Sequence, residues 1–417
     1  MRVGFIGKNS NEMVDVIIEH WNNGNSIVLV DPNMPLKKAM ILLEEIDVKI
    51  CYIDRCVIPT DIGYNGTIVC RYFLSSYSTS KCLSSIIRNK YCLNESFDEA
   101  VVFFSSGTTG INKAISLSHY AITNNAKKVV ALSDIGYKDI ICNVRLFSYS
   151  SAFVAELMVS LLTNAELYFC HSKTVGGILH NLHESHATYF NANPIILKLI
   201  TRYFSGDIKY PFLKKIYTSG ELIDINTIRK IHCLFKNAQV LNGYGFTEAG
   251  PRVTTQLFPN YETVDAGSCL PNVKVRIISE QGKVCSTNKI GEILVYTDTK
   301  YSGYLNKNGL LNKNSDEWLR SGDLGFFDEQ EHLHIIGRKD NVMIFQSHKI
   351  IPETVESYIC KNSDILYCKL FLKDNKICCD YFPAVRDESL KKLVQEMREE
   401  FLFFEIPSQF RFNKNLL

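Results

Sequence analysis

The chain lacks the features that mark several large classes of protein. Its 417 residues contain no uninterrupted apolar run long enough to span a bilayer, and the N-terminus has no signal-like apolar stretch. Charge of one sign is not in excess, since 46 Lys and Arg residues stand against 44 Asp and Glu residues, for a net charge of +2. That balance gives no electrostatic reason to expect nucleic acid or an anionic membrane as a partner. We expect a cytoplasmic globular protein with a large core.

Repeated metal-binding or disulfide patterns are also missing. The 14 cysteines are scattered without a repeated CxxC pair, which favours reduced thiols over a disulfide framework. Cys51 and Cys56 resemble half of a metal site, but no second half follows. His180, His183 and His186 recur every three residues on a predicted helix. No carboxylate or cysteine cluster supports them, so ordinary surface histidines are favoured over a metal site.

Strand-like and helix-like segments alternate through the first two thirds of the chain. Strands are predicted at 1–6, 26–30, 50–53, 166–170, 187–191, 214–218 and 239–243. A helix is predicted over 11–21, and a second one is opened by Pro32 and Pro35 and runs through residue 43. This alternation is typical of parallel strands covered by helices.

Beyond about residue 265 the pattern changes to short strands with turns. Strands at 273–279, 291–295, 325–328 and 332–336 predict a β-rich subdomain. From about residue 340, helices at 352–360 and 388–401 and strands at 366–372 and 377–381 predict a smaller α+β unit. The predicted fold class is therefore α/β, with a large N-terminal domain of stacked αβ subdomains, a β-rich subdomain and a small α+β C-terminal domain.

The most informative motif is SSGTTGINK at 105–113, which follows a predicted buried strand at 100–104. Glycines let backbone N–H groups approach phosphate oxygens closely, hydroxyls donate further hydrogen bonds, and Lys113 adds positive charge. The motif therefore suits phosphate binding. Only two threonines separate its two glycines, and this spacing conflicts with the P-loop of kinases and ATPases.

Four further segments combine glycine with side chains that suit a nucleotide. They are YTSGEL at 217–222, LNGYGFTE at 241–248, WLRSGDLG at 318–325 and IGRKDN at 336–341. Tyr244 can cover a base, and Glu248 can hold Mg²⁺ together with phosphate oxygens. Asp323, in a predicted turn, can accept both ribose hydroxyls, and Arg338 can donate to phosphate or ribose oxygens. Each segment alone also fits an ordinary loop, such as an Asx turn at Asp323.

In this order and spacing, the motifs resemble the adenylate-forming (AMP-binding) superfamily of acyl-CoA synthetases, acyl-AMP ligases and peptide-synthetase adenylation domains. Two more segments add to the resemblance, GEILV (291–295) with YSGYLN (301–306), and KIIPETVE (349–356). The resemblance runs over nearly the whole chain. It implies a large AMP-binding domain at 1–338 and a small C-terminal domain at 339–417 that moves about a hinge at Asp340.

The resemblance implies an ATP- and Mg²⁺-dependent ligase. A carboxylic acid would react with ATP to give acyl-AMP and pyrophosphate, and a thiol of CoA or of an acyl carrier protein would then displace AMP. Catalytic roles are implied for Thr247, Glu248 and Lys113, with Glu248 also the metal ligand. The implied nucleotide-binding residues are Ser105, Ser106, Gly107, Thr108, Thr109, Gly110, Lys113, Gly220, Glu221, Asn242, Gly243, Tyr244, Gly245, Thr247, Asp323 and Arg338.

Several positions depart from the family pattern. Lys414 does not match the family's C-terminal Gly-Lys segment, so the small domain is interpreted as truncated before the usual catalytic Lys. We therefore expect a slow first half-reaction or a cation supplied by another chain. Asn112 replaces a Pro, and Ser347 replaces a Gly along the pantetheine path, which disfavours CoA as the acceptor. Tyr149 and Ser151, in the acyl-pocket segment, favour a neutral carboxylic acid over an α-amino acid.

Two other functions fit part of the sequence. A non-catalytic, nucleotide-binding scaffold of the same family is favoured by the missing Lys segment. It is opposed by the retention of Thr247, Glu248, Asp323 and Arg338, which together serve four distinct chemical tasks. A P-loop kinase or ATPase conflicts with the glycine spacing and lacks an identifiable partner acid.

Overall fold

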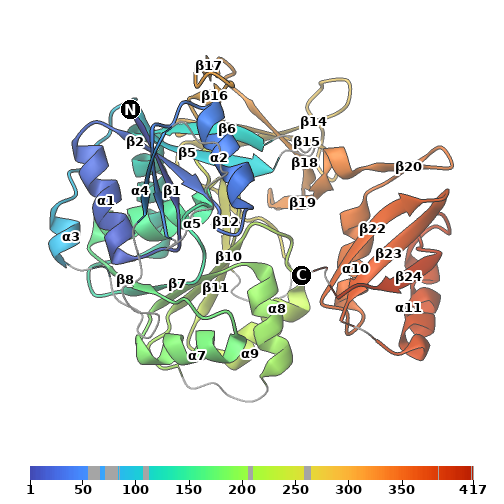
Figure 1. Cartoon of the computed structure of the whole chain (residues 1–417). Helices are drawn as coiled ribbons and strands as arrows, with labels where there is room; N and C mark the ends of the chain where they lie inside the picture. The colour runs from blue at the N-terminus through green and yellow to red at the C-terminus, as the bar shows by residue number, and fades with distance from the viewer. Residues whose placement is uncertain are drawn as a thin grey trace.

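Two large β-sheets form the body of the computed structural model, which describes residues 1–54, 66–70, 83, 85–106, 112–204, 210–257, 264–383, 385–414 and 416. The first has eight strands in the order β17-β16-β6-β5-β2-β1-β3-β4, and the second has seven in the order β13-β12-β11-β10-β9-β7-β8. Figure 1 shows the two sheets with helices between and around them. This layering buries both faces of most strands, which explains continuous apolar runs such as Ser26–Val30.

The strands of the first sheet are β1 (Arg2–Ile6), β2 (Ser26–Val30), β3 (Ile50–Ile53), β4 (Thr67–Cys70), β5 (Glu99–Ser106), β6 (Asn112–Ser118), β16 (Gly303–Leu305) and β17 (Leu311–Lys313). The strands of the second sheet are β7 (Ile140–Asn143), β8 (Glu166–Phe169), β9 (Tyr189–Ala192), β10 (Lys215–Ser219), β11 (Gln239–Tyr244), β12 (Thr254–Leu257) and β13 (Ser268–Cys269). Strands β7 to β11 pair in parallel, so their carboxyl ends share one edge.

Helices fill three layers around these sheets. The shared core between the sheets contains residues of α1 (Asn11–Asn22), α4 (His119–Ser133), the π-helical turn η1 (Phe153–Met158) and α6 (Val159–Thr163), and the short helix α5 (Ser150–Ala152) directly precedes η1. The outer face of the first sheet packs against α2 (Leu36–Glu45). The outer face of the second packs against α7 (Val175–Glu184), α8 (Pro194–Tyr203) and α9 (Ile225–Leu234). The short helix α3 (Ser85–Asn89) lies beside α1.

Side-chain caps fix where several of these helices begin. The residue before the first turn accepts a hydrogen bond from a backbone N–H of that turn, which satisfies a donor that has no partner within the helix. These capping residues are Ser10 for α1, Ser118 for α4, Thr174 for α7, Asn193 for α8 and Asp224 for α9.

The remaining residues form two smaller units. A four-stranded antiparallel sheet contains β14 (Val273–Ile278), β15 (Gly291–Thr297), β18 (Leu319–Phe327) and β19 (Leu333–Arg338). The C-terminal unit contains β20 (Met343–Phe345), β21 (His348–Ile350), α10 (Pro352–Lys361), β22 (Tyr367–Lys373), β23 (Lys376–Phe382), α11 (Asp387–Glu400) and β24 (Gln409–Phe412).

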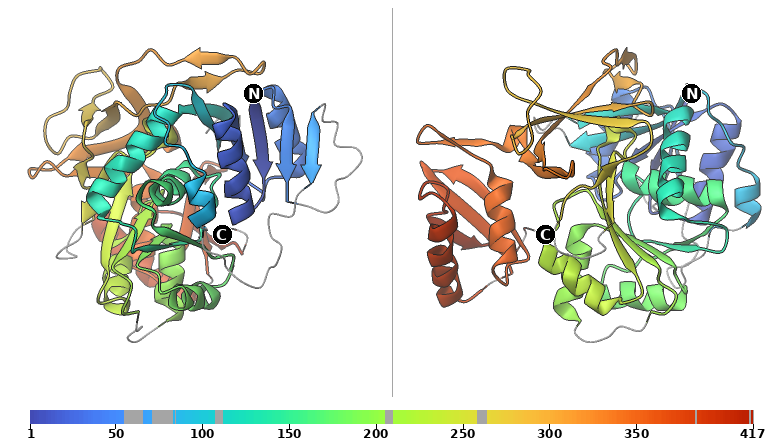
Figure 2. Two further views of the ribbon diagram at one scale, coloured as in Figure 1. Left: turned by 90° about the vertical axis from the view of Figure 1, so that its left-hand side faces the viewer. Right: turned by 180° about the vertical axis from the view of Figure 1, so that it is seen from behind.

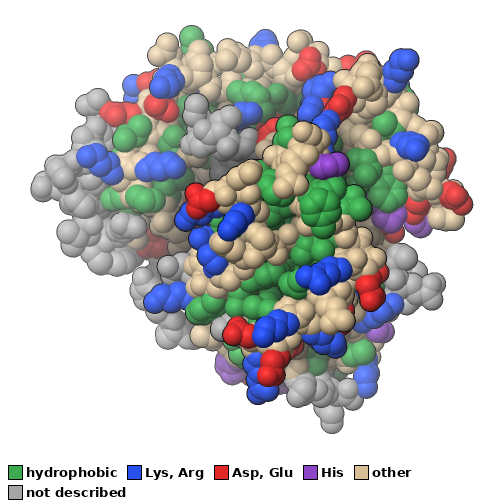
Figure 3. Space-filling model, turned by 90° about the vertical axis from the view of Figure 1, so that its right-hand side faces the viewer, with side chains coloured by type: hydrophobic (Ala, Val, Ile, Leu, Met, Phe, Trp, Pro, Cys, Tyr) green, Lys and Arg blue, Asp and Glu red, His purple; other side chains and the backbone are tan. Residues whose placement is uncertain are grey.

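The C-terminal unit has a core of its own, which contains Ile350, Val355, Leu393 and Met397. Figure 1 and the right-hand view of Figure 2 show this unit beside the main body, and in the left-hand view of Figure 2 it lies behind the body. It touches α8 where Arg202 Nη1 donates to the Asp364 carbonyl at 2.8 Å. Figure 3 shows the outer face on this side, where apolar patches lie among charged side chains. The division at 338/339 remains a prediction that this separate core supports.

The sequence predictions are largely confirmed for the regular elements. The predicted strands 26–30 and 50–53 coincide with β2 and β3, and β1 and α1 differ from their predictions by one residue at one end. The second helix begins at Leu36, after both prolines, because each proline disfavours a helical residue before it. His186 lies beyond the end of α7 with a positive φ of 52°, so the three histidines do not share one helix.

One predicted turn is wrong. The segment 318–325 is mostly strand, because β18 runs from Leu319 to Phe327. Leu294 pairs with Arg320 and Glu292 with Leu324, so residues 321–323 form a bulge opposite a single residue. Gly322 has a φ of 73° in this bulge, a value that glycine adopts easily.

Within the described part of the chain, no helix combines the length and the apolar character needed to cross a bilayer.

Candidate active site

The nucleotide side of the candidate site lies where β10 and β11 end. Ser219 pairs with Gly243, so the segments that follow these two strands leave the sheet side by side. Ligands of parallel sheets commonly bind at such carboxyl ends. The glycines here are required by close contacts: a Cβ on Gly243 would collide with the Tyr217 hydroxyl, and one on Gly245 would collide with the Pro251 carbonyl. Asn242 is held by a 3.0 Å hydrogen bond from its Nδ2 to the Asp265 carbonyl.

Asp323 is the centre of a buried cluster drawn from three strands. Its Oδ2 accepts a hydrogen bond from the Tyr244 hydroxyl at 2.6 Å, and its Oδ1 accepts one from Arg338 Nη1 at 2.9 Å. Arg338 Nη1 also donates to the Ser321 carbonyl at 3.1 Å. Burial raises the pKa of Asp323, while Tyr244 and Arg338 oppose that rise. The carboxylate is thus held in one orientation by two donors, and its remaining lone pairs can accept from a ligand.

The phosphate side brings Glu248 and Lys113 to the same tyrosine. Glu248, in the 3₁₀ turn η2 (Thr247–Ala249), accepts a hydrogen bond on Oε1 from the Tyr304 hydroxyl at 2.9 Å. Lys113 Nζ lies 5.2 Å from the centre of the Tyr304 ring. Tyr304 is positioned by β16, which pairs with β6 through Tyr304 and Ile115. The sequence offered YSGYLN as a family segment but gave Tyr304 no role, because its partners lie far away in the chain.

The structure describes the two ends of the predicted phosphate loop. Ser105 pairs with Lys113, and the backbone of Ser106 pairs with Asn112, so the two ends of the loop face each other across an antiparallel pair. The predicted residues Gly107, Thr108, Thr109 and Gly110 lie outside the described residues. Cys56 lies outside them as well, and Cys51 is a buried free thiol.

The predicted acyl-pocket segment touches the phosphate segment directly. The hydroxyls of Ser150 and Thr247 are 2.8 Å apart and share a hydrogen bond. The next residue, Ser151, accepts a hydrogen bond on Oγ from Arg145 Nη1 at 3.2 Å. Tyr149 is exposed, and its hydroxyl donates to Asp31 Oδ2 at 3.2 Å. The structure therefore brings Ser151 toward the protein interior and Tyr149 toward the surface.

A buried charged group that the sequence analysis missed lies behind Ser151. Glu156, in η1, and Arg145 form an ion pair with 3.3 Å between Glu156 Oε1 and Arg145 Nη2. Arg252, near the start of β12, is buried beside them. The sequence does contain a signal for this buried group. Glu156 is the one carboxylate in the apolar run 152–159, and a buried carboxylate needs a positively charged or hydrogen-bonding partner.

The remaining predicted residues have the following positions. Gly220 has a φ of 102° directly after β10, and burial raises the pKa of the neighbouring Glu221. Asp340 lies in the 3₁₀ turn η3 (Lys339–Asn341), between β19 and the C-terminal unit, and its role as a hinge stays a prediction. Ser347 has a φ of 65° in the turn between β20 and β21, a conformation that favours glycine.

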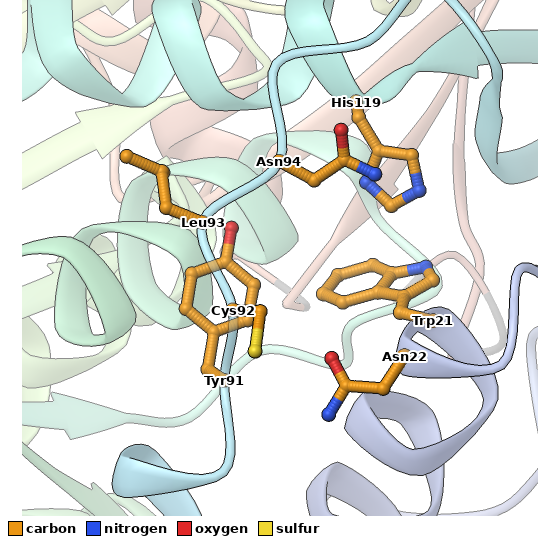
Figure 4. Close-up of a pocket in the computed structure, with 7 residues that line it drawn as sticks. All are labelled: Trp21, Asn22, Tyr91, Cys92, Leu93, Asn94 and His119. Atoms are coloured by element: carbon orange, nitrogen blue, oxygen red, sulfur yellow. The ribbon is translucent and has the colours of Figure 1, made fainter.

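A separate pocket of about 280 Å³ lies away from these residues (Figure 4). It is lined by Trp21, Asn22, Tyr91, Cys92, Leu93, Asn94 and His119. None of the predicted site residues lines it, and burial lowers the pKa of His119, which disfavours the charged form of that side chain. In the described ranges no three His, Cys, Asp or Glu side chains gather in a way that could hold a metal ion.

The sequence model of a family described as AMP-binding enzyme matches residues 1–305. The chain therefore belongs to the AMP-binding enzyme family. The predicted resemblance and the predicted α/β fold class are confirmed.

Among relatives, bacitracin synthase 3 of Bacillus licheniformis is 25% identical in an alignment of 431 positions that covers 97% of this chain but 6% of that protein. The 2-succinylbenzoate–CoA ligase of Enterococcus faecalis is 23% identical in an alignment of 369 positions that covers 86% of this chain and 72% of that protein. Among solved structures, o-succinylbenzoate CoA synthetase from Bacillus subtilis in complex with its acyl-adenylate intermediate has a TM-score of 0.81 at 18% identity, covering 99% of this chain and 84% of that one. The structural likeness shows a shared fold.

Proposed function

We propose that this chain is an ATP-dependent acyl-adenylating ligase that uses Mg²⁺. In the first step an oxygen of a carboxylate attacks the α-phosphorus of ATP, the bond to the β-phosphate bridge breaks, and pyrophosphate leaves. In the second step a thiolate attacks the acyl carbon, and AMP leaves with the carboxylate oxygen that formed the mixed anhydride. The thiol would belong to CoA or to an acyl carrier protein.

One juxtaposition carries this proposal. Thr247 lies between Tyr244 and Glu248 in the chain, and its hydroxyl is hydrogen bonded to Ser150 in the predicted acyl-pocket segment. A nucleotide seated on Asp323 and Tyr244, with its phosphates toward Glu248 and Lys113, would therefore meet an acid at Thr247. This arrangement suits a transfer between two bound anions, in which positioning and charge neutralisation do most of the catalysis.

Glu248 is the residue that suits Mg²⁺. Its half-buried carboxylate is held on Oε1 by Tyr304, and carboxylate and phosphate oxygens are the ligands this ion prefers. The ion, when bound, would offset the negative charge of the phosphates. Lys113, above the ring of the same tyrosine, adds a second positive charge on this side. A cytoplasmic location is part of the proposal and is supported by buried thiols without a disulfide, such as Cys51 and Cys368.

The test is pyrophosphate release from Mg·ATP across a panel of fatty, aryl, hydroxy, dicarboxylic and amino acids. The proposal predicts release that depends on the acid and that falls at least about 100-fold in Glu248→Ala. The matched control is Glu329→Ala, an exposed glutamate between β18 and β19, which should behave like the unaltered chain. Binding of Mg·ATP without release for any acid would favour the non-catalytic scaffold instead.

A further inference from the structure

Six polar residues form a buried layer on one face of the second sheet. Asn143, Asn191 and Tyr217 occupy adjacent positions on β7, β9 and β10, so their side chains point to the same face. Arg145, Glu156 and Arg252 lie over this face. We call these six residues the Arg252 cluster. Glu156 and Asn191 are 0% exposed and Arg252 is 2% exposed, so water does not solvate their polar atoms.

Three residues of the Arg252 cluster, Glu156, Asn143 and Arg145, form hydrogen bonds with one another. Glu156 accepts hydrogen bonds from Asn143 Nδ2 at 2.6 Å on Oε2 and from Arg145 Nη2 at 3.3 Å on Oε1. Arg145 also donates to Ser151 Oγ. The one carboxylate of the cluster is therefore already taken up by one guanidinium and one amide.

The other half of the cluster is not satisfied. The Arg252 guanidinium carbon lies 4.2 Å from the centre of the Tyr217 ring, and this cation–π contact stabilises the positive charge. The N–H groups lie in the plane of the guanidinium, so the ring does not accept hydrogen bonds from them. Its Nε and Nη2, and both amide atoms of Asn191, have no hydrogen-bond partner among the described residues. Two cations face one carboxylate, which leaves a surplus positive charge. Buried polar groups without partners cost several kcal/mol unless a ligand completes them.

The position of the Arg252 cluster indicates that the acid substrate would supply the missing hydrogen-bond partners. Ser151 links the cluster to Ser150, and Ser150 is hydrogen bonded to Thr247 at the proposed reaction centre. Arg252 follows Thr247 by five residues, and Tyr217 comes just before Gly220 on the nucleotide side. Glu156 lies on a π-helical turn, a local geometry found frequently at functional sites. An acid with one carboxylate at Thr247 would extend its other end toward Arg252.

We propose that Arg252, assisted by Asn191, binds a second anionic group on the acid, so that the preferred substrates are dicarboxylic or similarly dianionic acids. This inference rests on the proposed function and replaces the neutral acid expected from Tyr149 and Ser151 with a dianionic one. A neutral tail would leave the N–H groups of Arg252 unpaired, and a substrate ammonium would be repelled by the surplus charge.

The experiment compares acids in matched pairs. Succinate, glutarate, adipate and the three benzene dicarboxylates are paired with butyrate, valerate, hexanoate and benzoate. The rate of pyrophosphate release gives kcat/KM for each acid. Calorimetry without ATP measures the binding of each free acid. We expect at least one dicarboxylate to exceed its partner by about 100-fold or more, because the unpaired site rejects an acid that lacks the second anion.

Two variants separate recognition from folding. Arg252→Met keeps the bulk of the side chain and removes the charge, so the preference within each pair should fall to about 10-fold or less. Arg252→Lys keeps the charge and should restore part of the preference, and thermal melting of both variants shows whether they fold. A folded Arg252→Met chain with an unchanged preference would overturn the inference, as would equal kcat/KM values for both members of every pair.

The calorimetry keeps the two proposals apart. If no acid gives pyrophosphate but dicarboxylates bind more tightly than their partners in an Arg252-dependent way, the ligase proposal fails and the recognition site stands. If release occurs and depends on Glu248, but no dicarboxylate is preferred in either release or binding, the ligase stands and the recognition site fails.

Discussion

Around Asp323, the polar contacts run between protein groups, whereas around Arg252 several polar atoms meet no partner within the described residues. Asp323 draws one donor from β11 and one from β19, and it would offer a fixed acceptor surface to any nucleotide. The Arg252 guanidinium lies over the Tyr217 ring, and its Nε and Nη2, which have no hydrogen-bond partner among the described residues, would depend on the ligand. In the proposed ligase, ATP would bind a preorganised site around Asp323, and the acid would be selected by a site around Arg252 whose hydrogen bonds are left incomplete.

Glu156→Ala should produce the largest effect, because it leaves Arg145 and Arg252 buried without their carboxylate. We expect a loss of about 3–5 kcal/mol in the free energy of unfolding. Urea unfolding measures this loss, and Glu156→Gln, which keeps the shape and an acceptor oxygen, should lose clearly less. A loss no greater than that of Glu329→Ala would mean that the cluster does not depend on its one negative charge.

Asp323→Ala should come next and should act on both stability and nucleotide binding. It leaves Arg338 and the Tyr244 hydroxyl without their shared acceptor, at a cost of about 2–3 kcal/mol. It should also abolish any preference for ATP over 2′,3′-dideoxy-ATP in calorimetry, since the ribose hydroxyls lose their acceptor. Exposed Asp316→Ala is the matched control, and equal affinity of the unaltered chain for both nucleotides would contradict the ribose assignment.

The pH dependence of stability should separate the two regions further. Burial raises the pKa of Glu156 from 4.5 to about 7, against the opposing effects of Arg145, Asn143 and Arg252. Between these two values the folded chain holds a proton at Glu156 that the unfolded chain has lost, so stability falls as the pH rises. The difference between the unaltered chain and Glu156→Gln should change by up to about 1.4 kcal/mol per pH unit in that window. If the difference in unfolding free energy between the unaltered chain and Glu156→Gln did not change with pH, the pKa of Glu156 would lie near its ordinary value.

A pair of tyrosine variants should give the smallest effects. Tyr244→Phe removes the donor to Asp323 and should raise the KM for ATP about 5-fold, corresponding to one hydrogen bond of about 1 kcal/mol. Tyr217→Phe removes only a 3.1 Å hydrogen bond to Thr255 and keeps the ring under Arg252, so the KM for ATP should stay unchanged. Equal effects of both variants on the KM for ATP would mean that the region around Asp323 and the region around Arg252 do not have separate roles.

The same two regions differ in how far the sequence could predict them. The sequence predicts site roles for Tyr244, Thr247, Glu248, Asp323 and Arg338 because they lie in short glycine-containing segments whose order resembles a family. The bond between Tyr244 and Asp323 joins residues 79 positions apart, so no local pattern could give its geometry. The bulge at Asp323 was missed for a related reason, since it depends on pairing between β15 and β18.

The Arg252 cluster could not be assembled from local signals. The single carboxylate in an apolar helix at Glu156 required a partner, but the sequence does not say which cation supplies it. Arg252 comes 107 positions after Arg145 and follows Pro251 in a segment without periodicity. Alternation of strands and helices, by contrast, is a local property, and β2 and β3 were predicted with their observed bounds.

The most direct test of the proposed activity follows one oxygen atom. An acid labelled with ¹⁸O in its carboxylate is incubated with the chain, Mg·ATP and a thiol acceptor, and the AMP formed is analysed by mass spectrometry. Attack of the carboxylate on the α-phosphorus predicts AMP that carries one ¹⁸O atom, formed only with an acid that supports pyrophosphate release and absent in Glu248→Ala. AMP without the label, formed at the same rate with or without the acid, would contradict an acyl-adenylating ligase.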